Sequence, residues 1–174
     1  MRKNFFGISI LTVFFFISLL SGFAQKSKIQ TFSDQNFYKG IELFEKQKYG
    51  SARNFFEDVI DNETQAKSEL KTQAQYYLAM CAINLFHLDA EYLVFKFTRE
   101  NPESPLVNNA YFQLADYMYK KKTYAKAISY YNQVDRYLLS KEQLAEFYFQ
   151  KGFSYYSRNN YPDARVCFYE IKDY

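Results

Sequence analysis

The sequence has 174 residues, of which 48% are hydrophobic and 21% aromatic, and its formal net charge at pH 7 is +3. The near balance of basic and acidic side chains excludes a protein that binds nucleic acid through a basic stripe. The one histidine excludes a metal site built from several histidine ligands. None of the five glycines forms a phosphate-binding loop.

Residues 1–24 have the features of a secretory signal peptide: a positive start at Arg2 and Lys3, a long apolar middle and an exit of small residues. We expect cleavage before Gln25, which makes the protein exported and periplasmic, with a short linker over residues 25–32. The alternative is an uncleaved N-terminal helix that anchors the protein, since the apolar stretch approaches the roughly 20 residues that span a bilayer.

A sequence pattern recurs about every 37 residues. Its most regular marker is an alanine at positions 52, 90, 127 and 164. A fixed period of this size indicates stacked supersecondary units, each too small to bury its apolar face alone. We therefore predict an all-α fold, an α-solenoid of antiparallel helix pairs over residues 33–174, with about four repeats at residues 33–62, 67–101, 107–136 and 141–173.

Within the last two repeats, apolar residues at three- and four-residue spacing predict the helices. These cover residues 109–121, 124–136, 143–157 and 161–172. Ser140 with Gln143 forms a capping box at the start of one helix, and Pro162 opens another, where a missing amide hydrogen costs nothing. The proline-rich segment 101–105 marks the break between the second and third repeats.

Small side chains recur at two positions of each repeat. A small side chain lets two helices approach to the short end of the usual interaxial range. On the first helices these residues are Gly40, Ala79, Ala115 and Gly152, and on the second helices they are Ala52, Ala90, Ala127 and Ala164.

The third and fourth repeats carry a consistent set of large and small residues. The fourth has Tyr148, Gly152, Tyr155, Tyr161, Ala164 and Phe168; the third has Tyr111, Leu114, Ala115, Tyr124, Ala127 and Tyr131. This pattern resembles the tetratricopeptide repeat, and the first repeat matches it fairly well while the second is irregular. The whole chain resembles the N-terminal part of the long secreted or periplasmic tetratricopeptide proteins of Gram-negative bacteria. Because no polar capping helix follows the fourth repeat, we expect the array to continue beyond residue 174 or a partner to cover its last face.

The resemblance implies that the first helix of each repeat lines a concave partner-binding groove. At the positions of this chain that match the groove positions of the family, the residues are Phe112, Asp116, Tyr119, Phe149, Phe153, Tyr156, Tyr76 and Met80. This row lacks the Lys and Asn residues with which the best-known groove of the family clamps a peptide carboxylate. The alternative is that much of the row is ordinary packing between helices, as aromatic stripes at helical spacing usually are.

The function expected from these features is a non-enzymatic scaffold of the bacterial cell envelope that binds a peptide or protein segment. No cofactor, metal or nucleic acid is expected, and we expect His87 to be structural, because a catalytic histidine needs an oriented partner. Cys81 and Cys167 belong to repeats that do not touch, so we predict buried thiols rather than a disulfide. Two alternatives stay open: a structural subunit of an outer-membrane assembly or secretion complex, associated with that membrane through other proteins, and a glycan-binding protein.

Overall fold

The computed structural model describes residues 32–64 and 68–172. The expected signal peptide and cleavage site lie outside these ranges, as does most of the expected linker. Every element in the described ranges is helical, which confirms the predicted all-α class, and successive helices pack in antiparallel pairs as an α-solenoid. Residue 32, expected to end the linker, is already helical.

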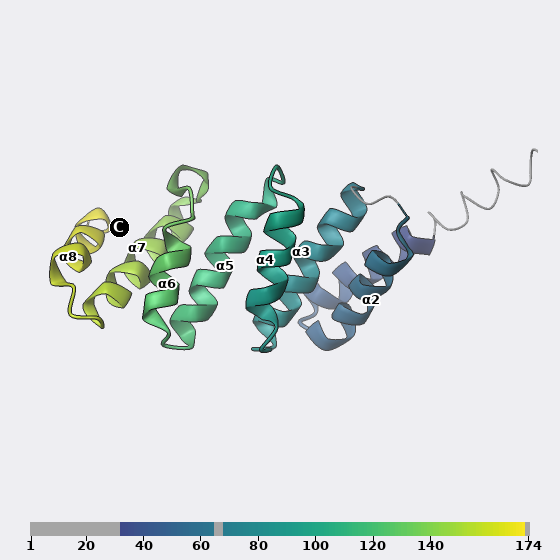
Figure 1. Ribbon diagram of the computed structural model, residues 1–174, viewed down its shortest axis with the longest axis horizontal. Helices are drawn as coiled ribbons and strands as arrows, with labels where there is room; N and C mark the ends of the chain where they lie inside the picture. The colour runs from purple at the N-terminus through teal and green to yellow at the C-terminus, as the bar shows by residue number, and fades with distance from the viewer. Residues whose placement is uncertain (1–31, 65–67, 173–174) are drawn as a thin grey trace, which may run out of the picture.

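The helices follow one another in chain order along the long axis of the molecule (Figure 1). A first helix covers residues 32–45. It is followed by α2 (Tyr49–Asn62), α3 (Glu69–Asn84), α4 (Ala90–Glu100), α5 (Leu106–Lys120), α6 (Tyr124–Tyr131), a 3₁₀ turn (Arg136–Leu138), α7 (Lys141–Tyr156) and α8 (Tyr161–Glu170).

The first helices of successive pairs lie closer together than the second helices do. Helix α5 contacts both α3 and α7, whereas no comparable backbone contact joins α2 to α4, α4 to α6 or α6 to α8 within the described ranges. The first helices therefore form the inner side of the solenoid, and the second helices form its outer side.

All four helix pairs turn in the same way. A residue with positive φ ends each first helix, and these are Gln47, Phe86, Lys122 and Asn159, with φ of 58°, 55°, 58° and 61°. The next residue donates its amide hydrogen to a carbonyl five positions back, for example Thr123 to Met118 at 2.9 Å. This is the Schellman motif, in which a left-handed residue closes the helix. It recurs here without glycine, so the usual sequence marker of this motif is absent.

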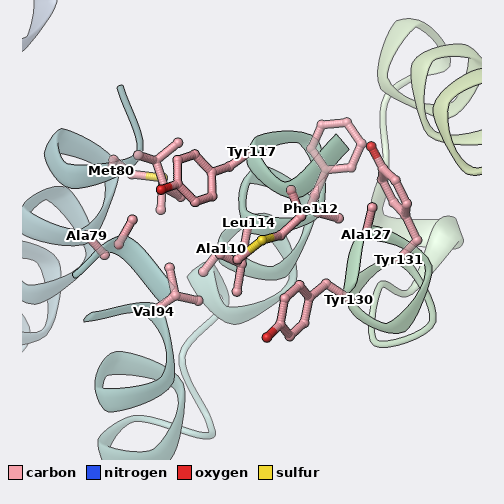
Figure 2. Close-up of a cluster of buried hydrophobic side chains, with 14 of the residues drawn as sticks. Ala79, Met80, Val94, Ala110, Phe112, Leu114, Tyr117, Ala127, Tyr130 and Tyr131 are labelled. Atoms are coloured by element: carbon pink, nitrogen blue, oxygen red, sulfur yellow. The ribbon is translucent and has the colours of Figure 1, made fainter. Parts of the chain in front are cut away.

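The small residues of the repeat lie where two helices meet. Ala52, Ala90 and Ala127 have no exposed surface, and a side chain at Gly40 would lie 2.7 Å from the ring of Phe56. Figure 2 shows alanines of α3, α5 and α6 among the large rings of the core. The prediction that small side chains allow close helix packing is confirmed at these positions.

Helix α6 is shorter than predicted, because it ends at Tyr131 rather than at residue 136. Asn108 of α5 accepts the amide hydrogen of Asp135 at 2.7 Å and donates to the carbonyl of Asp135 at 3.2 Å. Both backbone groups of Asp135 are thus taken by a side chain from another helix, and a helix cannot run through this residue.

Two local predictions are confirmed. The capping box at the start of α7 is present, with Ser140 accepting from the Gln143 amide and Gln143 accepting from the Ser140 amide. Cys81 and Cys167 are free and buried.

Candidate functional site

The residues predicted to line the groove divide by exposure. Those that are buried, with at most 6% of their surface exposed, are Met80, Phe112 and Asp116. Those that are partly buried are Tyr76, Tyr119 and Phe153. Those that are exposed are Phe149 at 50% and Tyr156 at 55%. The prediction of a surface position needs correction for the buried residues, above all for Met80 and Phe112, which belong to the core.

Phe112 is buried because its position is a junction of three helices. Its ring lies 6.4 Å from the ring of Tyr131 on α6 (Figure 2), and the Tyr131 hydroxyl donates a hydrogen bond to Gln150 on α7. Phe149 occupies the equivalent position in the fourth pair, 6.3 Å from Phe168. Phe149 is exposed because no described helix covers that side of α8.

Five rings at the turns of the third and fourth pairs form a continuous series, here called the aromatic ladder: Tyr124, Tyr119, Phe153, Tyr156 and Tyr161. The ring centroids are separated by 6.1 Å from Tyr124 to Tyr119, by 5.8 Å from Tyr119 to Phe153 and by 6.4 Å from Phe153 to Tyr156. Tyr156 continues the series to Tyr161 at 5.6 Å. Edge and tilted contacts at these separations are favourable arrangements for aromatic rings.

The ladder is built by the ends of helices that meet at the turns of the third and fourth pairs. Tyr119 and Tyr156 lie at the ends of α5 and α7, while Tyr124 and Tyr161 begin α6 and α8. Phe153 stands one turn before the end of α7 and faces both rings of the third pair. The repeated turn geometry therefore places aromatic residues from two pairs on one surface.

Exposure increases along the ladder from the third pair to the fourth. Tyr119, Tyr124 and Phe153 are partly buried, and Tyr156 and Tyr161 are each 55% exposed. Burial raises the pKa of Tyr119, helped by the neighbouring Tyr124 and Asp116, so its hydroxyl stays protonated and can donate a hydrogen bond at neutral pH.

Asp116 supplies a negative group next to the ladder. Its Oδ2 pairs with Lys120 at 2.6 Å, while its Oδ1 is buried without a hydrogen-bond donor among the described residues. An unsatisfied buried acceptor costs about 1–3 kcal/mol, and the burial of Oδ1 keeps it out of reach of a partner at the surface.

The polar groups next to Asp116 already have partners. Gln150 accepts from the buried Tyr131 hydroxyl and donates to Glu146 at 2.7 Å. Burial, with the negative charges of Asp116 and Glu146, raises the pKa of Tyr131. These bonds hold α6 and α7 in register under the ladder.

The ladder does not extend into the second pair. Tyr76 lies in the middle of α3, where its hydroxyl donates to Asn109 on α5 at 2.7 Å and its ring packs 5.7 Å from Phe97. Burial raises the pKa of Tyr76 to about 12. Tyr76 therefore joins two repeats and offers little surface to a partner.

A further hollow lies elsewhere, between the start of α3 and the loop before α5. It has a volume of about 670 Å³. Thr72 donates to Asn101 on the wall of this hollow, and Asn101 also donates to Gln75, both at 2.8 Å. These bonds join α3 to the end of α4 within the second repeat.

His87 lies beside a pair of oppositely charged residues. His87 lies 3.1 Å from the Arg53 guanidinium, and Arg53 pairs with Asp89. No group of three or more potential metal ligands occurs in residues 32–64 and 68–172. Over the same ranges, no helix combines the length and the apolar character that a membrane crossing requires.

Comparisons with known proteins leave the functional argument to the structure. No family model, no curated protein and no solved structure matches this chain. The fold and the aromatic ladder are thus the grounds on which a function can be argued.

Sequence reasoning found three members of the ladder as groove candidates, namely Tyr119, Phe153 and Tyr156. It treated Tyr124 and Tyr161 only as markers of the repeat. Their place at the start of each second helix, directly after a tight turn, was the signal that could have added them.

Proposed function

We propose that the chain is a tetratricopeptide-repeat scaffold of the bacterial cell envelope, which binds a peptide or protein segment across the aromatic ladder and catalyses no reaction. The repeat pattern supports the family, and the signal-like residues 1–24 support export. The observation that carries the binding proposal is the ladder itself, a partly exposed series of rings at the turns of the third and fourth pairs. Exposed apolar surface of this kind marks interaction sites.

The binding energy comes mainly from burial of the exposed rings. Tyr156 and Tyr161 have the most surface to lose, and truncation of a central aromatic in an interface often costs 2 kcal/mol or more. The tyrosine hydroxyls favour a segment that carries hydrogen-bonding groups beside an aromatic or aliphatic side chain. The near neutrality of the chain means that added salt weakens binding only slightly.

The test uses peptides selected from a random display library on the chain of residues 25–174. We expect Tyr156→Ala to weaken the selected peptides by roughly 30-fold, which corresponds to about 2 kcal/mol. The matched control is Tyr92→Ala, an exposed tyrosine (63%) on α4 that is outside the ladder. Equal losses for the two variants would contradict the proposal, and selection of oligosaccharides in a parallel array would favour glycan binding instead.

The second candidate function is a structural subunit of an outer-membrane assembly or secretion complex. The observation that favours it is the exposed apolar side of α8, where Val166 and Tyr169 are 60% and 64% exposed. Under this alternative, large partners cover that side permanently, and Tyr156→Ala has no more effect than Tyr92→Ala.

A further inference from the structure

The side of the fourth pair that faces away from α6 is apolar and has no described helix packed on it. We call it the open face and define it by Phe149, Arg165, Phe168 and Tyr169. A hollow of about 500 Å³ lies on it, and its lining residues are Tyr156, Tyr161, Ala164, Arg165, Phe168, Tyr169 and Lys172. The open face therefore adjoins the ladder at Tyr156 and Tyr161.

The residues of the open face repeat those of the first pair. Where the fourth pair has Gly152, Ala164, Arg165 and Phe168, the first pair has Gly40, Ala52, Arg53 and Phe56. The two pairs differ in what lies on top of them. Phe56 has no exposed surface because Tyr77 of α3 stacks on it, with ring centroids 5.4 Å apart and an interplanar angle of 17°.

A charged pair joins each of the first two repeats to the next one. The residue that follows the repeat alanine bonds to the residue that precedes the next repeat alanine: Arg53 to Asp89 at 2.7 Å, and Glu91 to Lys126 at 2.7 Å. Both pairs join the same two repeat positions, but the positive and the negative residue are exchanged between them. In the fourth repeat the corresponding residue is Arg165, so the matching group on an occupant of the open face is a carboxylate.

At the opposite end of the solenoid, the corresponding surface of the first helix carries charged side chains. At the positions where α3 presents Leu78 and Cys81 to the first pair, the first helix has Lys39 and Glu42. Lys39 pairs with Glu42 at 2.7 Å, and both side chains are exposed. This end cannot cover the apolar open face of a second copy in the way that α3 covers the first pair.

We propose that the open face binds a helix pair of a partner protein with the chemistry of α3 and α4. The first helix of that pair is amphipathic and places an aromatic ring on Phe168, as Tyr77 does on Phe56. Its second helix begins with a carboxylate that pairs with Arg165, as Asp89 does with Arg53. The proposal does not depend on peptide binding at the aromatic ladder, although the two surfaces share Tyr156 and Tyr161.

The test supplies such a helix pair at high effective concentration. Residues 25–172 are followed directly by a second copy of residues 61–101, which continues the register because Lys172 is equivalent to Ile60. Hydrogen exchange is then followed by mass spectrometry in peptides from α8. We expect these amides to exchange at least about tenfold more slowly than in the chain without the extension, because packed helices open less often.

Charge variants show whether the contact is the proposed one. Arg165→Glu reverses most of the protection, and Asp89→Arg in the appended copy alone restores it in that variant. Unchanged exchange in α8 on extension, or equal protection with and without Arg165→Glu, overturns the proposal. Sedimentation of the unextended chain gives a second arm: we expect a monomer, and a dimer that Phe168→Asp abolishes would assign the open face to a second copy instead.

Discussion

Gly40 and Gly50 stand ten residues apart in surroundings that differ completely. A Cβ atom at Gly40 would lie 2.7 Å from the ring of Phe56, whereas nothing lies within 4 Å of a Cβ atom at Gly50. Phe56 is fully buried, so its ring has little room to move aside. Glycine is thus required at position 40 because of the neighbouring Phe56 ring, and not because of the helix that contains it.

We expect Gly40→Ala to lower the free energy of unfolding by about 1–3 kcal/mol, as overpacking of a filled core does. Gly50→Ala, the matched control within helix α2, should raise it by up to about 1 kcal/mol, because alanine is the better helix former. Urea denaturation of the two variants measures both effects. Two changes of the same sign would contradict the close helix contact at Gly40.

The left-handed residues at the four turns allow a second residue-scale prediction. Lys122 has φ of 58°, a conformation that costs a side chain roughly 1–2 kcal/mol and that glycine adopts freely. We expect Lys122→Gly to stabilise the protein in thermal denaturation, with the gain reduced by the greater freedom of glycine in the unfolded chain.

Asn159 is the control for this prediction, since asparagine tolerates the left-handed region better than lysine does. Asn159→Gly should therefore give a smaller gain than Lys122→Gly. A loss of stability for Lys122→Gly would mean that the lysine side chain contributes more than the backbone conformation costs.

At the scale of helices, the second helices are joined mainly by side chains. The hydrogen bond from Arg53, together with its charge, holds the pKa of Asp89 below its usual value. Burial acts to raise the pKa of Glu91, but the bonds from Lys126 and Tyr130 outweigh it, and the pKa is lowered overall. Both carboxylates therefore link α4 to a neighbouring helix in their charged form.

The pH dependence of stability follows from these two lowered pKa values. A carboxylate whose pKa is depressed by folding stabilises the protein above its unfolded pKa, about 3.9 for Asp and 4.3 for Glu, and this is lost as the pH falls through the folded pKa. We expect the melting temperature to fall between about pH 5 and pH 3. The double variant Asp89→Asn with Glu91→Gln should show a shallower fall.

Asp61→Asn is the control, because Asp61 is exposed and makes no ion pair in the described part of the chain. This variant should keep the slope of the unmodified protein. If the double variant also keeps that slope, the pairs between second helices contribute nothing measurable, as is common for exposed ion pairs.

The helices themselves could be predicted from the sequence because their apolar spacing is regular. The end of α6 could not, since it depends on Asn108, a residue of the preceding helix that binds the backbone of Asp135. The positions of the turns could be predicted, but their geometry could not. A Schellman motif is usually recognised by a glycine, and these turns have Gln47, Phe86, Lys122 and Asn159 instead.

At the scale of the whole molecule, the row of groove candidates was predicted by assuming one geometry for every repeat. The assumption holds for Tyr119 and Tyr156, which occupy equal positions on the ladder. It fails for Phe112 and Phe149, because the exposure of that position depends on whether another helix covers it. The repeat period identifies equivalent positions in the sequence, but the exposure of each residue depends on the helices packed around it.

The stacked architecture also predicts which helices a destabilising substitution affects. Ala127 has no exposed surface, and Ala127→Leu forces extra atoms into the contact between α5 and α6, at a cost of about 1–3 kcal/mol. Because each repeat contacts only its neighbours, hydrogen exchange should accelerate most in α5, α6 and α7 and least in the first helix. Uniform acceleration along the chain would contradict the solenoid's local coupling.

The binding role of the aromatic ladder is tested most directly by mapping where a bound peptide lies. A peptide selected on residues 25–174 is titrated into ¹³C-labelled protein, and the ring resonances of Tyr and Phe are followed by nuclear magnetic resonance. The account predicts the largest shifts at Tyr119, Phe153 and Tyr156, with Tyr92 and Phe95 on α4 unchanged. Shifts centred on α4, with the ladder unchanged, would contradict it.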